Sequence, residues 1–286
     1  MKIFMAKDAG YCFGVRDAVN LAYDTAEKNG DVYMLGHIVH NENVVKDLDT
    51  AGAKVINSLE DIPNNNPILF RAHGTTVETW NDAKAKHINI VDATCPLVLE
   101  IHAEVKKLEA EGRTIIIIGD HGHDEVVGIA SQVKDAIIVS SPDEAKSLRK
   151  MKQAGVVSQS TQTIENVQEI INIIMTKVFD LRFVNTICYP TKRNQSQIKE
   201  LAKQCDVMIV IGSYTSANSK RLTALAKERN AHSFQVTCAN EINPKWLKSA
   251  EIVGVSAGAS TPDNIIDEVL TKIKEIGQVP EETIYG

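Results

Sequence analysis

Three of the five cysteines occupy similar places in the sequence. Cys12, Cys95 and Cys188 each end a short apolar run and are followed at once by an aromatic residue or by proline. They lie roughly 80 to 95 residues apart, which is about the length of one small α/β unit. Three such units could each present one thiolate to a common centre. Three soft ligands around one point indicate a metal centre with a vacant position.

The other two cysteines have the surroundings of packing residues. Cys205 lies where a helical pattern meets a buried strand, and Cys238 follows the strand-like run 234–237. Cysteine outside disulfides is among the most buried residue types. Cytosolic thiols are normally kept reduced, and the five cysteines show neither close pairing nor C-x-x-C spacing. The pattern therefore favours metal ligation or packing over disulfides.

The composition is that of a soluble globular protein. The chain has 286 residues, 43% of them hydrophobic and 24% charged, and a net charge of −6. No apolar run approaches the ~18 residues of a membrane span, and the apolar stretch at the start is too short for a secretion signal. We therefore expect a cytoplasmic protein that contacts no membrane. The charge balance also disfavours nucleic-acid binding, so an anionic small ligand would have to be held by local groups.

Buried-strand patterns alternate with helical patterns along the chain. Most strand candidates are continuous β-branched runs without polar alternation, which is typical of parallel strands covered on both faces. The strand candidates lie at 2–6, 32–35, 67–71, 88–92, 114–118, 136–139, 154–157, 207–211, 233–236 and 252–255. The helical patterns include 17–28, 97–111, 165–177, 195–204, 219–228 and 262–276. The alternation predicts an α/β fold with mostly parallel sheets.

The spacing of the cysteines also suggests a division into three similar α/β units. No Pro-rich, Ser-rich or low-complexity linker separates them. We place the boundaries near Cys95 and Cys188, which gives units at 1–95, 96–188 and 189–286.

Polar loops follow several predicted strands. They contain histidines, glycines and small hydroxyl or amide residues, and they lie at 71–74, 119–125, 157–162, 212–219 and 256–262. In open parallel sheets ligands bind beyond the carboxyl ends of the strands, so these loops should line one site. Such hydroxyls, with the N–H groups of helix N-termini, can bind phosphate without a lysine or arginine clamp. Helix capping is their ordinary alternative use, and the chain has neither a P-loop nor a G-x-G-x-x-G after its first strand.

The segment 121–125 holds two imidazoles and two carboxylates directly after a predicted strand. This cluster suits metal ligation or acid–base catalysis, because histidine titrates near neutral pH and burial can raise the pKa of a glutamate towards it. A solvated polar loop is the plain alternative. Further histidines lie beside glycine or asparagine, and their repeated placement after strands favours a functional role for His37, His40 and His73.

Eight motifs occur in order along the chain. They are CFGV at 12–15, VHN at 39–41, AHG at 72–74, DATCPLV at 92–98, GHDEV at 122–126, CYPT at 188–191, SKRL at 219–222 and AGASTP at 257–262. In these motifs the chain resembles the 4-hydroxy-3-methylbut-2-enyl diphosphate reductase family. The resemblance runs from Met1 to about Ile276, nearly the whole chain.

The resemblance implies a trefoil of three α/β units around a [4Fe–4S] cluster. Its three protein ligands would be Cys12, Cys95 and Cys188, which leaves one iron open for the substrate's hydroxyl oxygen. The implied reaction is the reductive dehydroxylation of 4-hydroxy-3-methylbut-2-enyl diphosphate to isopentenyl and dimethylallyl diphosphate, the last step of the non-mevalonate isoprenoid pathway. The implied partner is an electron donor of the ferredoxin or flavodoxin type, and we expect a monomer.

The resemblance also implies roles for individual residues. Glu125 matches the proton donor, whose proton could reach the leaving oxygen through Ser160, Thr161 or a water. The positions that match the family's substrate-binding residues are His40, His73, His123, Ser160, Thr161, Ser216, Ala217, Asn218 and Ser260.

Three departures from the family pattern affect this set. The usual Gln-Thr-Thr appears as Gln-Ser-Thr at 159–161 or as Thr-Gln-Thr at 161–163, so the hydroxyl that reaches the substrate could be that of Ser160, Thr161 or Thr163. Ala217 replaces the second serine of the usual Ser-Ser-Asn-Ser and retains only the backbone N–H. The order Arg-Asn-Gln at 193–195 differs from the family's Asn-Arg-Gln, so no role is assigned to Asn194.

Two other functions compete with this interpretation. A zinc hydrolase could use His121, His123 and Glu125, but it would need a third ligand within about 2 Å of the metal and would give the cysteines no role. A non-enzymatic iron–sulfur redox sensor would bind a cluster but would not need the serine and histidine loops.

Overall fold

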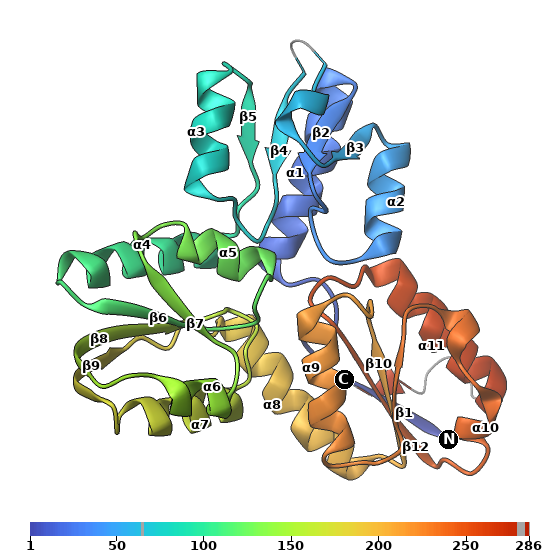
Figure 1. The fold of residues 1–286 in the computed structure, drawn as a ribbon. Helices are drawn as coiled ribbons and strands as arrows, with labels where there is room; N and C mark the ends of the chain where they lie inside the picture. Colours follow the sequence, from blue (N-terminus) through green and yellow to red (C-terminus); the bar gives the residue numbers. More distant parts are fainter. Residues whose placement is uncertain (64–65, 279–283, 286) are drawn as a thin grey trace. The chain divides into compact units, whose positions relative to one another are not determined.

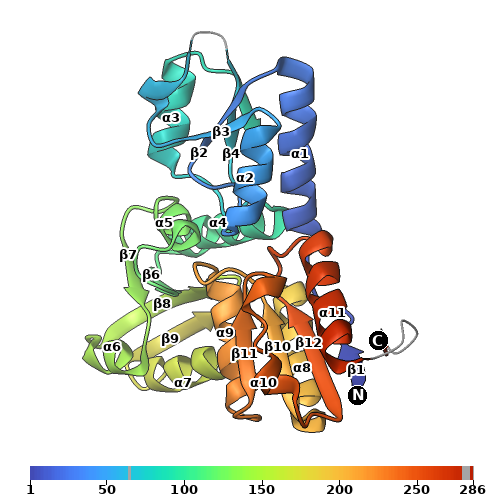
Figure 2. The same ribbon diagram turned by 90° about the vertical axis from the view of Figure 1, so that its right-hand side faces the viewer.

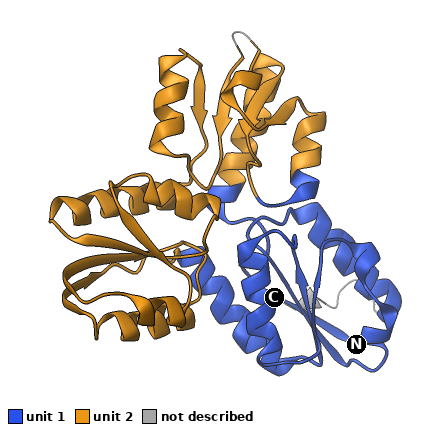
Figure 3. Cartoon of the chain, viewed as in Figure 1, with its two compact units in different colours: residues 1–15, 40–44, 189–286 blue, residues 16–39, 45–188 orange. Residues whose placement is uncertain are grey.

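The computed structural model describes residues 1–63, 66–278 and 284–285 (Figure 1). In this part of the chain the strands form three sheets, and all paired strands are parallel. The chain divides into two compact units (Figure 3). Unit 1 comprises residues 1–15, 40–44 and 189–286, and unit 2 comprises residues 16–39 and 45–188. The predicted α/β class with parallel sheets is confirmed.

The first sheet of unit 2 has the strand order β3-β2-β4-β5. Its strands are β2 (Val32–Leu35), β3 (Ala53–Ile56), β4 (Ile68–Phe70) and β5 (Ile90–Asp92). The helical segments nearby in sequence are α1 (Phe13–Asn29), α2 (Glu42–Thr50), the short 3₁₀ helix η1 (Leu59–Asp61) and α3 (Val77–Ala85). The three residues of β4 are fully buried, and Phe70 meets the edge of Trp80 on α3 with ring centroids 4.9 Å apart.

The second sheet of unit 2 has the order β7-β6-β8-β9. Its strands are β6 (Thr114–Ile118), β7 (Ala136–Val139), β8 (Met151–Ser158) and β9 (Val178–Phe183). Its helices are α4 (Pro96–Ala110), α5 (Asp124–Ala130), α6 (Pro142–Ser147) and α7 (Ile164–Ile174). Ile115 and Ile117 pack with α4 and α5, whereas Ile116 and Ile118 pack with α6 and α7 (Figure 2). Both faces are thus covered, which explains a strand without polar alternation.

The sheet of unit 1 has the order β11-β10-β12-β1-β13. Its strands are β1 (Lys2–Met5), β10 (Val207–Ile211), β11 (Ser233–Val236), β12 (Ile252–Ala257) and β13 (Ile284–Tyr285). Its helical segments are α8 (Tyr189–Gln204), α9 (Ala217–Lys227), the 3₁₀ helix η2 (Ala239–Glu241), α10 (Pro244–Leu247) and α11 (Asp263–Gly277). Ile209 and Ile211 pack with α11, whereas Met208 and Val210 pack with α8 and α9.

The first four strands of each sheet have the same order, and each cysteine of interest follows the fourth strand of that order. Cys95 comes after β5 and Cys188 after β9, and both strands are at an edge of their sheet. The equivalent strand in unit 1 is β1, which pairs with β12 and leads to Cys12. The predicted unit 1–95 therefore differs from the structure at its start, because β1 lies in the sheet of the C-terminal residues. As domain limits, the divisions at Cys95 and Cys188 remain predictions.

All ten predicted strands overlap strands of the structure, but β3, β9 and β13 were not predicted. In β9 the side chain of Phe179 is 92% exposed, so this edge strand lacks the continuous burial that marks the central ones. Helix α8 begins six residues before the predicted start at 195 and includes Pro190 in its first turn. Proline is tolerated there because the first N–H groups of a helix have no intrahelical acceptor. None of the helices that the structure describes has the length and apolar character that a membrane crossing requires.

Candidate active site

Cys12, Cys95 and Cys188 each lie directly before the first residue of a helix of 15 to 17 residues, namely α1, α4 and α8. All three are half-buried, and none of the five cysteines, all within the described residues, forms a disulfide. The N-terminus of a helix carries partial positive charge, which favours an anionic sulfur at this position. The three residues therefore have the local setting of thiolate ligands.

The backbone of each of these cysteines is fixed by the same hydrogen bond. In every case the cysteine N–H donates to a carbonyl just beyond the neighbouring strand. The bonds are Cys12 to Ala259 after β12 (3.4 Å), Cys95 to Ala72 after β4 (3.0 Å) and Cys188 to Ser160 after β8 (3.0 Å). The acceptor of the Cys188 bond is the carbonyl of Ser160, itself a predicted substrate residue. The other two acceptors directly precede the predicted substrate residues His73 and Ser260. Each cysteine is thus attached to a loop predicted to hold substrate.

The remaining two cysteines differ from these three. Cys205 is buried in the apolar cluster of α8, β10 and α9, and this burial raises the pKa of its thiol. The prediction that Cys205 is a packing residue is confirmed. Cys238 is half-buried at the start of η2, where its carbonyl accepts the N–H of Glu241.

Glu125 lies in the first turn of α5 and its side chain is buried. Its two carboxylate oxygens accept different bonds from one residue, since the Ser160 N–H lies 2.6 Å from Oε1 and the Ser160 hydroxyl 2.8 Å from Oε2. The same Ser160 binds Cys188 through its carbonyl. Ser160 therefore connects the carboxyl group to a cysteine and offers a hydroxyl through which a proton can pass.

Two predicted histidines lie beside Glu125 in unit 2. The rings of His73 and His123 meet edge to face with centroids 5.7 Å apart. Nδ1 of His123 accepts the backbone N–H of Glu125 at 3.2 Å and so caps α5. A nitrogen that accepts this bond carries no proton, so in the neutral ring Nε2 is the donor. His123 can thus present an N–H group to an anionic ligand.

Arg71 and Asp124 form an ion pair that the sequence did not predict. The Arg71 guanidinium follows β4 and lies 2.6 Å from the Asp124 carboxylate at the start of α5. It joins the loop that carries His73 to the helix that carries Glu125. No local signal could reveal this pair, because its members are 53 residues apart in the chain.

The polar loops of unit 1 lie beyond β10 and β12, two paired strands. Ser216 caps α9 by accepting the Ser219 N–H. The amide nitrogen and oxygen of Asn218 and the hydroxyl of Ser219 are buried and have no hydrogen-bond partner among the described residues. Buried polar groups nearly always have partners, so these atoms point to a bound polar ligand.

The space beside Ser219 depends on two glycines. A Cβ atom at Gly212 or at Gly258 would lie 2.3 or 2.1 Å from Ser219 Oγ. These distances are well below van der Waals contact, so neither position could carry a side chain with the serine in this place. The loops after β10 and β12 approach each other closely here.

His40 and Ser260 are also brought together in unit 1. The Ser260 hydroxyl donates to the His40 carbonyl at 3.3 Å, and the Asn41 amide donates to the Ser260 carbonyl at 2.8 Å. The segment 40–44 is thereby fixed to the loop after β12. Ala217 is the first residue of α9, between Ser216 and Asn218.

The structure thus groups most of the predicted site residues within each unit. Unit 2 brings together His73, His123, Glu125 and Ser160, and unit 1 brings together His40, Ser216, Ala217, Asn218 and Ser260. Thr161 accepts a hydrogen bond from the side chain of Gln159, and Thr163 caps α7. The buried Asn194 binds the Ala257 carbonyl and the Ser256 hydroxyl, which is a packing role.

His121 lies apart from this group. Its side chain is 56% exposed and its Nε2 lies 2.9 Å from a carboxylate oxygen of Glu144 on α6. The three-residue group that a zinc hydrolase would need is therefore not assembled around Glu125.

Comparisons with known proteins agree with the motifs. Residues 3–274 match the family model described as LytB protein. The chain is 42% identical to 4-hydroxy-3-methylbut-2-enyl diphosphate reductase of Geobacter metallireducens, with 96% of this chain and 98% of that protein aligned. It is 41% identical to the reductase of the same name from Geobacter sulfurreducens, again over 96% and 98% of the two chains.

Two solved structures are also similar. One is described as (E)-4-hydroxy-3-methyl-but-2-enyl diphosphate reductase, the terminal enzyme of the non-mevalonate pathway, and matches with a TM-score of 0.72 and 34% identity over 96% of this chain and 100% of that one. The other is the E-1-hydroxy-2-methyl-but-2-enyl-4-diphosphate reductase from Plasmodium falciparum. It matches with a TM-score of 0.92 and 27% identity over 100% of this chain and 91% of that one.

The contacts of Glu144 generate a prediction about pH. Hydrogen bonds from the backbone and hydroxyl of Ser140 and from His121 lower the pKa of Glu144 from 4.5 to about 2. A carboxyl group whose pKa is lower in the folded state than in the unfolded state stabilises the fold at pH values above its unfolded-state pKa. This contribution is lost as the pH falls towards the folded-state pKa. Glu144→Gln should therefore lower the melting temperature at pH 7, and the difference from wild type should shrink between pH 4.5 and 3. The measurement is calorimetry across this range, with Glu169→Gln on the exposed surface of α7 as control. A difference in melting temperature between Glu144→Gln and wild type that stayed constant with pH would contradict this role of Glu144.

Proposed function

The chain belongs to the LytB protein family, and on this premise we propose that it reduces 4-hydroxy-3-methylbut-2-enyl diphosphate to isopentenyl diphosphate and dimethylallyl diphosphate. It is accordingly an oxidoreductase and the terminal enzyme of the non-mevalonate pathway. The reaction breaks the bond between C4 and its hydroxyl oxygen. Two electrons and two protons are consumed, one proton leaves with the oxygen as water, and the other is added to carbon.

Cys12, Cys95 and Cys188 would hold an iron–sulfur cluster. The donor set fits such a group, since three half-buried thiols lie at helix N-termini with a common backbone anchor. The [4Fe–4S] type follows from the family resemblance and matches three thiolate ligands with one iron left open. When bound, the cluster supplies electrons one at a time and a Lewis-acidic iron.

The diphosphate would be held by neutral groups rather than by lysine or arginine. The strongest support is the buried amide of Asn218, whose nitrogen and oxygen have no partner among the described residues, together with the Ser219 hydroxyl. The hydroxyls of Ser216 and Ser260, the N–H of Ala217 and the rings of His40, His73 and His123 complete the proposed set. Neutral donors suffice because hydroxyl, amide and helix N-terminal N–H groups all bind phosphate oxygens.

Glu125 would supply the proton that leaves with the substrate's oxygen. Its carboxyl group is buried and held by Ser160, whose hydroxyl lies 2.8 Å from Oε2. This hydroxyl can pass a proton from the carboxyl group to a substrate oxygen, so Ser160 is the proposed relay. Thr161 remains a proposed substrate contact, whereas the hydroxyl of Thr163 is used to cap α7.

One observation carries the proposal: each cysteine N–H is bonded to a loop with a proposed substrate residue or proton relay. These backbone bonds support a site in which the proposed cluster ligands and the proposed substrate residues lie on connected pieces of backbone. A redox sensor would not need the buried polar groups of Asn218 and Ser219, and a zinc hydrolase would not need the cysteines.

An electron donor of the ferredoxin or flavodoxin type is the proposed partner. Phe13 and Tyr189 directly follow two of the proposed ligands, and their rings stack 5.7 Å apart with planes 9° from parallel. They are 36% and 53% exposed, so a partner protein could contact them. The cytoplasmic location and the monomeric state remain predictions from the sequence.

The ligand assignment predicts which cysteines the cluster requires. Cys12→Ser, Cys95→Ser and Cys188→Ser should each abolish or severely reduce iron and sulfide content, because a hydroxyl is a much poorer ligand for such clusters than a thiolate. Cys238→Ser and Cys205→Ala should retain both. The measurement is iron and sulfide analysis with an absorption spectrum after anaerobic purification. Normal iron in any of the first three variants, or its loss in both controls, would refute the assignment.

The buried amide predicts a substrate-binding defect. Asn218→Ala should weaken substrate binding by about 1 to 3 kcal/mol, because phosphate oxygens lose a buried partner. The cluster should be unaffected. Substrate affinity can be measured by titration of the holoenzyme, with Lys227→Ala at the exposed end of the same helix as control. Equal affinity in Asn218→Ala and wild type would place the diphosphate elsewhere.

The proposed acid predicts a separation of binding from chemistry. Glutamine keeps the shape of the side chain but supplies no acidic proton, so Glu125→Gln should bind substrate and retain the cluster while turnover falls roughly 100-fold or more. Turnover is measured with an artificial one-electron reductant and binding by the cluster's spectral response to substrate. Glu144→Gln provides the same substitution outside the site. A rate within about threefold of wild type would exclude this role for Glu125.

A further inference from the structure

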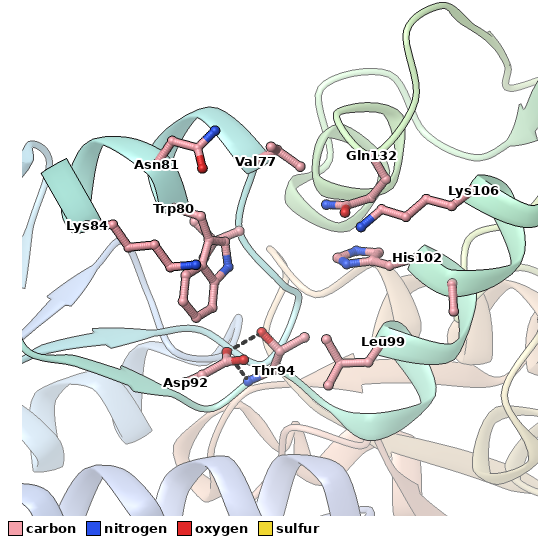
Figure 4. A pocket seen from close by; sticks show the side chains of 12 residues that line it. Val77, Trp80, Asn81, Lys84, Asp92, Thr94, Leu99, His102, Lys106 and Gln132 are labelled. Atoms are coloured by element: carbon pink, nitrogen blue, oxygen red, sulfur yellow. Dashed lines mark hydrogen bonds between the residues drawn. The ribbon is translucent and has the colours of Figure 1, made fainter. Parts of the chain in front are cut away.

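Unit 2 contains a pocket that the proposed reaction does not use. It has a volume of about 480 Å³ and lies between α3 and α4, with Gln132 on a third side (Figure 4). Its size falls within the range of pockets that hold small organic molecules. It contains none of the residues proposed for catalysis, substrate binding or cluster ligation.

His102 on α4 is a buried polar side chain of this pocket. It is 8% exposed, and its Nε2 has no hydrogen-bond partner among the described residues. Burial, together with the nearby charge of Lys106, lowers the pKa of His102 to about 4, so the ring is neutral at pH 7. Figure 4 shows the ring extending from α4 into the pocket beside Gln132. A neutral imidazole with an unsatisfied nitrogen is a ready hydrogen-bonding group for a ligand.

Two lysines extend into the pocket from opposite walls. Lys84 comes from α3 and Lys106 from α4, and neither has a carboxylate partner in the described part of the chain (Figure 4). By contrast, the nearby Lys86 pairs with Glu60. Asp92 is the one acidic residue among those that line the pocket, and its Oδ1 accepts the N–H and the hydroxyl of Thr94. The cations outnumber the carboxylate, which favours an anionic ligand.

The pocket also offers a flat apolar wall. Trp80 is held by its edge contact with Phe70, 4.9 Å between ring centroids, and the Lys84 ammonium lies 5.3 Å from the centre of its indole ring. Val77 and Leu99 add apolar surface, and Leu99 is 45% exposed. An aromatic wall beside an ammonium group suits a planar ring that carries an anionic substituent.

We propose that this pocket binds a small phosphate ester with a planar ring. The phosphate is held by Lys84 and Lys106, the ring lies against Trp80, and His102 and Gln132 provide hydrogen bonds. This ligand differs from the diphosphate substrate in its site and in its use of lysine side chains. The inference does not depend on the proposed reaction.

Tryptophan fluorescence of the holoenzyme can test the proposal, because the chain has two tryptophans. Trp246 stacks on Phe234 in unit 1, so Trp246→Phe is a conservative change that leaves Trp80 as the one remaining reporter. AMP serves as the probe, and inorganic phosphate and adenosine separate the contributions of the anion and the ring. We expect a saturable response to AMP with a Kd below about 1 mM, and at least about tenfold weaker binding of either fragment.

Charge variants decide whether the response comes from this pocket. In the Trp246→Phe background, Lys84→Gln and Lys106→Gln should each weaken AMP binding by about tenfold or more, whereas Lys107→Gln, an exposed neighbour outside the pocket, should leave it unchanged. Thermal unfolding of each variant checks that the fold is retained. Absence of a saturable response up to about 10 mM AMP, or equal binding by both pocket variants and wild type, would overturn the proposal.

Discussion

The hydrogen bond from a cysteine N–H to the loop beyond the neighbouring strand is the constraint on which the candidate site depends. It occurs at Cys12, Cys95 and Cys188. Parallel strands end at the same edge of a sheet, so the residue after one strand can reach the carbonyl after the next. The bond fixes the backbone that carries each sulfur and involves only main-chain atoms. The sheet thus determines the backbone position of each cysteine, and the helix N-terminus and the polar loop act on a sulfur at that position.

The sequence predicted the parts of this arrangement that leave local signals. Ile115–Ile118 was recognisable as a strand because both of its faces are buried, and the motif around Cys95 marked the end of another. Strand β9 was missed because Phe179 is exposed at a sheet edge. The pairing of Arg71 with Asp124 could not be predicted, because it joins residues far apart in the chain without any local pattern.

Stability and ligand binding make opposite demands on the loops of unit 1. The amide of Asn218 and the hydroxyl of Ser219 have no partner in the described part of the chain, and a buried group in this state costs about 1 to 3 kcal/mol of folding stability. Ser216 offsets part of this cost by capping α9, and Asn41 ties the loop after β12 to residues 40–44. The loops are therefore held in place by contacts that leave the polar groups of Asn218 and Ser219 available.

The place of β1 in its sheet determines when the protein can be completed during synthesis. β1 pairs with β12, so it has no native neighbour until residues 252–257 have been made. The carbonyl that anchors Cys12 belongs to Ala259 and emerges later still. Unit 2, residues 16–39 and 45–188, can fold during translation, whereas the setting of Cys12 forms only once Ala259 has been made. A cofactor that needs all three cysteines in these settings can be installed only after Ala259 has been made.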